Sequence, residues 1–408
     1  MSYRIKKGIL TKFLITLVAF IVSGCAQKMP ENAGVKEYDT FYIPEYTSPE
    51  PNLVTLQFYL KKNLRDADGF GKLSIDGSDT PRRLAFDVGE NQYLKNQMDS
   101  TGLISYLFYD QGKVVYDELS DDQRFGRFVD GSTPLWTHSI GKSWTSYLLG
   151  HAICEGYIDS VQSQLNDWAL IEDTLYGGQP LLNLINMRAG DQFVVTEADG
   201  LLSSGRWFNT HPISAFSAVE LANTYPARRV YNYNGLVTNI ILNYIFFKTG
   251  EETSDFLNRV FRDHVGIEND VFFLTQSGVP MEYGPVRYSA RASRYDFLRV
   301  GLAMLEDWEA NNCVGKYLKS ITDFSESISN VYNPRFRLSR ATRYGGFFFT
   351  HYKGMRNRNV LGMDGYGGQA QLIDFDNERI VSVNTIHTNY DWDELVYRAI
   401  RDGDIHRE

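Results

Sequence analysis

A serine and a lysine three positions apart, Ser139 and Lys142, form the segment best suited to nucleophilic chemistry. They lie in the stretch Thr-His-Ser-Ile-Gly-Lys, residues 137–142, where apolar and small residues begin to recur with helical spacing. Residues at i and i+3 share a helical face, so the amine can lie beside the hydroxyl. A serine needs a neighbouring base to become a nucleophile, and desolvated lysines serve as such bases. The pattern predicts a nucleophile at a helix N-terminus, against the simpler alternative of a serine N-cap followed by a solvated lysine.

A second candidate group is the tyrosine-rich segment Val-Tyr-Asn-Tyr-Asn-Gly, residues 230–235, which precedes an apolar helical pattern. A phenol beside an ammonium group can take a proton from a serine and later give it to a leaving group. Tyr231 and Tyr233 both fit this role, and either one can instead be a loop aromatic packed on the core. The Lys-Thr-Gly at residues 248–250 ends this helical pattern, and we interpret it as ordinary last-turn and C-cap residues.

A third group is glycine-rich: Gly365-Tyr366-Gly367-Gly368-Gln369, directly before a strand-like run. Small residues at the end of a strand let another chain or a substrate approach the backbone closely. The alternative is a glycine-rich hairpin or bulge with no role in chemistry.

The elements around these groups indicate an α+β fold. Residues 103–109 and 114–118 are apolar-aromatic runs separated by Asp-Gln-Gly-Lys, which predicts a hairpin. Helical spacing follows over 139–157 and 292–305, and the stretch between 160 and 285 alternates short helical patterns with turns. The C-terminal part is strand-like at 345–352, 368–375 and 379–385 and closes with an amphipathic helix over 391–400. Strands at both ends of a helical insert predict one sheet that the chain leaves and rejoins.

Serine helix, tyrosine loop and glycine strand, in this order, resemble the family of class C β-lactamases, penicillin-binding DD-peptidases, related esterases and aminohexanoate-oligomer hydrolases. The resemblance covers roughly residues 85–400 and implies a β-lactamase/DD-peptidase-like fold, an antiparallel sheet flanked by helices with an inserted helical lobe at about 145–290. It implies Ser139 as nucleophile, Lys142 and Tyr233 as proton carriers, and the N–H groups of Ser139 and Gln369 as an oxyanion hole. The motif register favours Tyr233 over Tyr231.

Departures from the family pattern bear on the substrate. Gly235 stands where β-lactamases and peptidases usually carry an asparagine, and Tyr366-Gly367-Gly368 offers no fixed positive charge for a substrate carboxylate. With Trp207, these residues are the expected lining of the substrate cleft. They favour an ester or an uncharged amide as the small-molecule substrate. Two alternatives stay open: a β-lactamase or DD-peptidase, and a non-catalytic envelope-binding protein of the same fold.

The N-terminus has the pattern of a bacterial lipoprotein signal peptide. Residues 1–24 combine a positive n-region with an apolar run too short to span a bilayer, and small residues precede Cys25, the expected lipid attachment site. Residues 25–84 then form a tether and N-terminal extension, 85–400 the hydrolase domain and 401–408 a tail. We expect a lipid-anchored protein of the cell envelope, on the outer membrane in a Gram-negative host. Of the remaining cysteines, Cys154 and Cys313, a buried Cys154 thiol is favoured over a disulfide.

Composition excludes other classes of function. The chain has 41 Lys+Arg against 50 Asp+Glu, a net charge of -9, and no basic block, which argues against a nucleic-acid partner. No Cys-x-x-Cys or His-Glu-x-x-His spacing is present, so no metal site is expected. The expected chemistry needs no cofactor.

Overall fold

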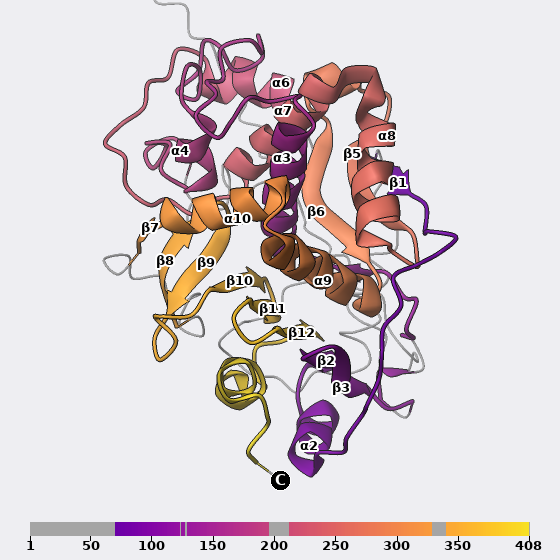
Figure 1. Ribbon diagram of the computed structural model, residues 1–408. Coiled ribbons are helices and arrows are strands. Elements are labelled where there is room, and N and C mark those ends of the chain that lie inside the picture. Colours follow the sequence, from indigo (N-terminus) through magenta and orange to yellow (C-terminus); the bar gives the residue numbers. More distant parts are fainter. Residues whose placement is uncertain (1–69, 123, 127–128, 196–211, 329–339, 408) are drawn as a thin grey trace, which may run out of the picture. The chain divides into compact units, whose positions relative to one another are not determined.

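The computed structural model describes residues 70–122, 124–126, 129–195, 212–328 and 340–407, and Figure 1 shows the order of their helices and strands. These residues all belong to one unit, Glu37–Glu408. In these ranges no helix combines the length and the apolar character needed to cross a membrane.

An eight-stranded antiparallel sheet is the larger of two sheets that the described residues form. Its order is β3 (Lys113–Leu119), β2 (Leu103–Asp110), β12 (Arg379–Thr385), β11 (Gln369–Asp374), β10 (Val360–Gly365), β9 (Phe348–Tyr352), β8 (Ala341–Gly345) and β7 (Glu326–Ser327). The predicted hairpin is β2–β3, and its turn places Gln111 and Gly112 at φ values of 45° and 98°, where glycine is favoured at the second position. Because β2 pairs with β12, the two ends of the domain meet in one sheet, as the strand pattern predicted.

A second, four-stranded antiparallel sheet is formed by β1 (Phe70–Ile75), β5 (Val271–Gln276), β6 (Val286–Ala292) and β4 (Leu135–Trp136), in that order. The sequence pattern missed this sheet. Strand β1 lies in the expected N-terminal extension and pairs with β5, which lies in the expected helical lobe. Each strand is short, and pairing across such a separation leaves no local signal in the sequence.

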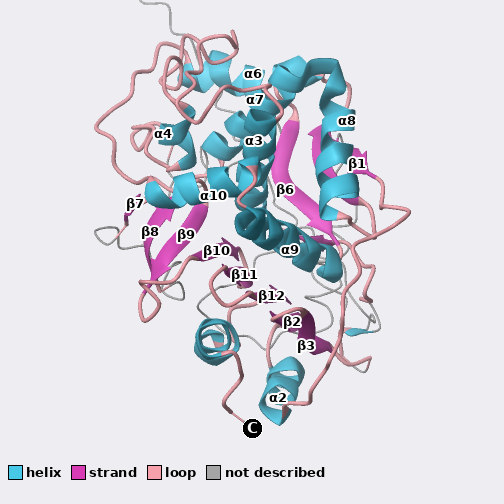
Figure 2. Ribbon diagram, in the orientation of Figure 1, coloured by secondary structure: helices cyan, strands magenta, loops and turns pink. Residues whose placement is uncertain are grey.

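Helices cover both faces of the large sheet (Figure 2). Helix α3 (Ile140–Cys154) and helix α9 (Arg294–Ala310) pack on one face, against β10, β11 and β12. On the other face lie α2 (Gln92–Ser100), η7 (Asp393–Arg398) and α11 (Ala399–Asp402). The remaining helical elements are α4 (Leu181–Ile185), α6 (Ile213–Phe216), η2 (Ser217–Leu221), α7 (Leu236–Thr249), η3 (Gly250–Glu252), α8 (Thr253–Leu257), η4 (Asn258–Val265), η5 (Met281–Tyr283) and α10 (Cys313–Asp323).

Helix α3 is the central helix of the fold. Its residues from Ile140 to Ala152 are all buried, because α7, α10 and β6 also pack against it. Buried Lys142 and His151 stand near its two ends, among apolar and small side chains. A helix hydrophobic all round is typical of the middle of a larger protein, and here it fixes the position of everything attached to its first turn.

The end of α3 also carries a disulfide, Cys154–Cys313, with Cα atoms 5.8 Å apart. The sequence-based preference for a buried Cys154 thiol is therefore wrong. The two cysteines are 159 residues apart, and they meet because α10, which begins at Cys313, packs along both α3 and α9.

Candidate active site

The turn that precedes α3 presents Ser139 in a constrained backbone. The ring of His138 stacks on Trp136 with centroids 4.3 Å apart, and His138 has a φ of 47°, in the left-handed region that non-glycine residues rarely adopt. Strained residues of this kind cluster at functional sites. Burial and the nearby Arg291 guanidinium lower the pKa of His138 to about 3, so its imidazole is neutral at pH 7.

Some of the backbone N–H groups at this turn donate hydrogen bonds within the part of the chain that the structure describes, and one does not. The N–H groups of Ile140, Gly141 and Lys142 donate to the carbonyl oxygens three residues earlier, at 3.0 to 3.2 Å. For the Ser139 N–H no acceptor is found within the described ranges. A free N–H at a helix start beside a serine is the donor that an oxyanion hole requires.

Lys142 follows one turn later, and its side chain contacts two aromatic rings. Its Nζ donates to the Tyr288 hydroxyl at 2.6 Å and lies 3.9 Å from the centre of that ring. The centre of the Tyr233 ring lies 5.0 Å away on another element. Only 2% of Lys142 is exposed, and no ion pair joins it to a carboxylate of the described residues. Burying an ammonium group without a carboxylate is costly, and such groups are typical of functional sites.

Tyr233 lies near Lys142 and Tyr231 lies deeper in the core. The Tyr233 ring packs on Tyr344 and Phe349, with centroids 6.0 and 6.4 Å away, and one face turns to Lys142. Tyr231 is 8% exposed and its ring meets Tyr344 edge-on. Of the two tyrosines that the sequence offered, Tyr233 is the one for which the structure records a contact with Lys142.

A buried carboxylate, Asp191, holds the tyrosine loop in place. Asn232 donates to its Oδ1 at 2.7 Å, while Asn234 and the Tyr176 hydroxyl donate to its Oδ2 at 3.0 and 2.9 Å. Burial nevertheless raises the pKa of Asp191, with these hydrogen bonds acting in the opposite direction. Residues on both sides of Tyr233 are thus fixed to one point, which orients the phenol between them.

Sequence reasoning missed Tyr288, the residue that contacts Lys142 most closely. Tyr288 lies on β6, and its backbone N–H donates to Asn239 Oδ1 of α7 at 2.9 Å. A Cβ on Gly141 would lie 2.3 Å from the Tyr288 carbonyl oxygen, so only glycine allows β6 to approach α3 this closely. No motif marks Tyr288, because a strand pairing brings it to the site.

The glycine-rich segment meets the serine turn from the other side. Gly365 ends β10, and a Cβ on it would lie 3.0 Å from the Thr137 carbonyl oxygen. Gly367 and Gly368 have φ values of 80° and 91°, which side chains disfavour, and the Gly368 carbonyl accepts from the Tyr390 hydroxyl at 2.7 Å. These contacts place the segment beside the turn that carries Ser139.

Gln369 begins β11 and is buried, with 1% exposed. Its Nε2 donates to the Thr385 carbonyl oxygen, and its Oε1 accepts from the Thr385 N–H at 3.3 Å. The amide side chain is therefore bound to β12, so any contact with substrate falls to the backbone of this residue.

The expected cleft residues are only partly brought together. The Tyr366 ring lies 5.8 Å from that of His138, next to Ser139. Gly235 is the N-cap residue of α7, and its carbonyl accepts from the Asn239 N–H at 3.1 Å. Trp207, and Cys25 at the N-terminus, lie outside the described residues.

The Lys-Thr-Gly segment lies where the sequence pattern predicted. It ends α7, with Gly250 as C-cap at a φ of 56°, and Lys248 pairs with Asp167 at 2.7 Å. Since α7 places this lysine in a surface ion pair, it does not take part in the site.

Neither a family model nor a curated protein matches the chain. Solved structures do match. A protein assigned as a 6-aminohexanoate-dimer hydrolase, from Bacillus anthracis, superimposes with a TM-score of 0.61 at 15% identity, over 87% of this chain and 95% of that one. A penicillin-binding protein homologue from Caulobacter crescentus gives 0.53 at 12% identity, over 77% and 96% of the two chains. A D-amino acid amidase from Ochrobactrum anthropi gives 0.50 at 13% identity, over 74% and 94%.

These likenesses, at such low identity, establish the fold. The chain has the mixed helix and antiparallel-sheet fold of β-lactamases and penicillin-binding proteins, which confirms the fold class expected from the three motifs.

Proposed function

We propose that this protein is a serine hydrolase that cleaves an ester or an amide through an acyl-enzyme on Ser139. The observation that carries the proposal is the position of Lys142, buried one helical turn after Ser139 and in contact with two tyrosines instead of a carboxylate. Such a lysine contributes little to stability, because desolvation of its charge is not offset by an opposite charge. The fold adds support, because the structures that share it include proteins named as hydrolases and amidases.

In the proposed reaction Ser139 Oγ attacks the substrate carbonyl carbon and gives its proton to the pair formed by Lys142 and Tyr233. The tetrahedral oxyanion accepts hydrogen bonds from the backbone N–H groups of Ser139 and Gln369. The same proton then passes to the leaving group as its bond to the carbonyl carbon breaks. Water attacks the acyl-enzyme in a second step of the same kind and releases the acid.

Tyr288 has a positioning role in this scheme. Its hydroxyl accepts from Lys142 Nζ at 2.6 Å and so fixes the direction of the ammonium group. Tyr233 contacts the same group through its ring, whose centre lies 5.0 Å from Lys142 Nζ. Exchanged roles for the two tyrosines are the alternative.

The proposed substrate is an ester or an amide without a carboxylate next to the scissile bond. Tyr366-Gly367-Gly368 carries no cation and Gly235 carries no side-chain amide, so the segment that flanks Ser139 offers no partner for a substrate carboxylate. A β-lactamase or DD-peptidase, whose substrates bear such a carboxylate, is the second candidate because of the fold.

We also propose that the protein is exported and anchored by lipid at Cys25. The Cys154–Cys313 disulfide supports export, because such bonds persist in oxidising compartments. A Cys25→Ser variant should lose the lipid mass and move from the detergent phase to the aqueous phase in a partition assay. Retention in the detergent phase would contradict the anchor.

A substrate panel tests the hydrolase proposal. Purified wild type and Ser139→Ala are compared on p-nitrophenyl esters, uncharged anilides and a chromogenic cephalosporin. Ester or anilide hydrolysis that the variant loses supports the proposal, and a preference for the cephalosporin supports the second candidate. Binding of a ligand without turnover, unchanged in Ser139→Ala, would favour the non-catalytic binding protein instead.

A further inference from the structure

Three potential metal ligands meet far from Ser139. They are His151 near the end of α3, His264 on η4 and Asp307 on α9, and their ligand atoms all lie within 4.8 Å of one another. His264 Nε2 is 3.0 Å from Asp307 Oδ1, and the two imidazole rings are 5.1 Å apart. His151 follows Ser139 by twelve residues, which corresponds to about 18 Å along the helix axis.

His151 has an unused ring nitrogen at this point. The residue is 8% exposed, and its Nε2 is buried without a hydrogen-bond partner among the described residues. Buried polar atoms are nearly always paired, so this nitrogen calls for an explanation. One ring nitrogen of His151 lies within 4.8 Å of a nitrogen of a second imidazole and of a carboxylate oxygen, and these are donor atoms that bind metal ions.

The electrostatics of the backbone favour a cation at this position. His151 lies in the last turn of α3, which ends at Cys154, and His264 in the last turn of η4. Asp307 lies in the last turn of α9. The C-terminal end of a helix carries a partial negative charge, which the ends of α3 and α9 and one carboxylate supply here. The end of η4 already binds the Arg82 guanidinium through the His264 and Val265 carbonyl oxygens.

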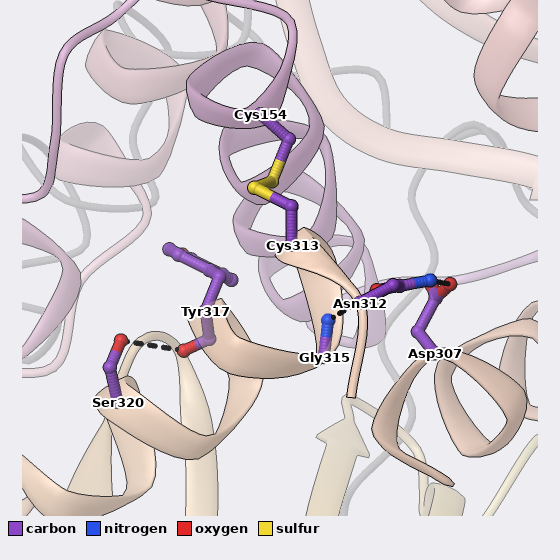
Figure 3. The surroundings of a disulfide bond; sticks show 7 residues. All are labelled: Cys154, Asp307, Asn312, Cys313, Gly315, Tyr317 and Ser320. Carbon is purple, nitrogen blue, oxygen red and sulfur yellow. Dashed lines mark hydrogen bonds between the residues drawn. A yellow bond between two sulfur atoms is a disulfide. The ribbon is translucent and has the colours of Figure 1, made fainter. Parts of the chain in front are cut away.

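The carboxylate is oriented by a second layer of hydrogen bonds. The Tyr147 hydroxyl donates to Asp307 Oδ2, and Asn312 Nδ2 donates to Oδ1 at 2.7 Å. Asn312 immediately precedes Cys313, and Figure 3 shows Asp307, Asn312 and the disulfide together. Metal-binding carboxylates commonly have such outer partners, which fix the ligand before the ion arrives.

We propose that His151, His264 and Asp307 bind one divalent transition-metal ion, with zinc as the ion best suited to two imidazoles and a carboxylate. Ligand atoms around tetrahedral zinc lie about 3.3 Å apart, so the widest separation would have to close by roughly 1.5 Å, which side-chain rotation of a histidine permits. The His264 side chain is 36% exposed, which gives the ion an entry path and leaves the fourth position to water. The site is independent of the proposed hydrolase chemistry, because its ligands lie near the opposite end of α3.

Zinc binding to the untagged full-length protein in detergent tests this inference. The metal-free protein is titrated with Zn²⁺ against a chromogenic chelator, and Co²⁺ is added separately to record its visible spectrum. His151→Gln and His264→Gln each remove one ligand. His406→Gln is the matched control, since His406 pairs with Asp402 at 3.0 Å in the same way, outside the cluster.

One equivalent of zinc should bind the wild type and His406→Gln alike, and each ligand variant should bind at least about 30-fold more weakly. Cobalt should give a four-coordinate spectrum only with the wild type and the control. Thermal unfolding of the metal-free proteins shows whether a variant is folded, and His264→Gln, at the more exposed position, guards against a misfolded His151→Gln. The inference is overturned if the wild type binds no zinc, or if His151→Gln and His264→Gln both bind zinc as tightly as the wild type does.

Discussion

At its N-terminal end helix α3 follows a strained residue and presents a serine, whereas its C-terminal end is held by a disulfide and by a network of hydrogen bonds. His138 has a φ of 47° and Lys142 is buried against phenols. At the other end Asp307 accepts from Tyr147 and Asn312, next to Cys313. The comparison teaches that the two ends of one buried helix are built differently: the first turn carries the groups of the proposed chemistry, and the last turn is firmly attached.

Two carboxylates show the same contrast. Asp307 is buried, and although burial opposes it, hydrogen bonds from His264, Tyr147 and Asn312 lower its pKa. Asp364 lies on β10, one residue before Gly365, and its Oδ1 is buried without a hydrogen-bond partner in the described ranges. Burial raises its pKa to about 7. Of these two carboxylates, the one near the serine turn has an oxygen without a partner in the described ranges, and the one at the far end of α3 has partners for both oxygens.

The largest predicted effect is the loss of activity when Lys142, at the N-terminal end of α3, is replaced. We expect Lys142→Met to lower kcat/KM for an ester substrate by about 10³-fold, because the proton of the serine loses its path. Lys248→Met is the matched control, since it removes the lysine of the literal Lys-Thr-Gly and an exposed ion pair. It should leave kcat/KM within about twofold of the wild type. Equal losses in the two variants would contradict our assignment of the lysine.

Removing the disulfide should affect the other end through stability. The bond closes a loop of 159 residues, so Cys154→Ala with Cys313→Ala should lower the free energy of unfolding by about 2–5 kcal/mol in urea titrations. Wild type unfolded under reducing conditions should show a similar loss. The rate at which a fluorophosphonate modifies Ser139 in the folded double variant should change little. A loss of reactivity as large as that of Lys142→Met would contradict the claim that the C-terminal end of α3 acts only through stability.

Replacing each of the two tyrosines that contact Lys142 should lower kcat by a different factor. Tyr233→Phe removes the proposed proton carrier and should lower kcat by about 10²-fold, with a changed pH profile. Tyr288→Phe removes only the hydrogen bond that directs Lys142 and should lower kcat by about tenfold. Tyr231→Phe is the control from the same loop and should have little effect. A larger loss of kcat in Tyr288→Phe than in Tyr233→Phe would assign the proton transfer to Tyr288 on β6.

The smallest predicted effect is at Asp364, and it concerns how the free energy of unfolding depends on pH. Its pKa of about 7 in the folded chain lies above the ordinary aspartate value of 3.8, so folding favours the protonated form. The stability that this proton contributes is complete below about pH 4 and is lost as the pH rises through 7. The advantage in stability of Asp364→Asn over the wild type should therefore be larger at pH 8 than at pH 4.5.

Urea titrations of both proteins at the two pH values measure this difference. Asp307→Asn offers the comparison from the far end of α3, where the carboxylate accepts hydrogen bonds, and it should be less stable than the wild type at pH 8. An Asp364→Asn variant whose advantage is no larger at pH 8 than at pH 4.5 would show that this carboxylate is not destabilised by burial.

The motifs that are contiguous in sequence predicted the fold class, and the structure brings two of their residues, Lys142 and Tyr233, together. The β2–β3 hairpin follows from Gln111 and Gly112, and helix α3 from its spacing of apolar residues. Tyr288 and the Cys154–Cys313 bond could not be predicted in this way, because strand pairing and helix packing bring distant residues together. The expectation that no metal is bound rested on contiguous spacings, which do not test a cluster built from three helices.

Modification by a fluorophosphonate, followed by intact-protein mass, tests the central claim most directly. The probe phosphonylates an activated serine and adds a known mass. We predict one adduct on the wild type, none on Ser139→Ala, and slow labelling of Lys142→Met. No adduct on folded wild-type protein, or an adduct that persists in Ser139→Ala, would contradict the assignment of Ser139 as an activated nucleophile.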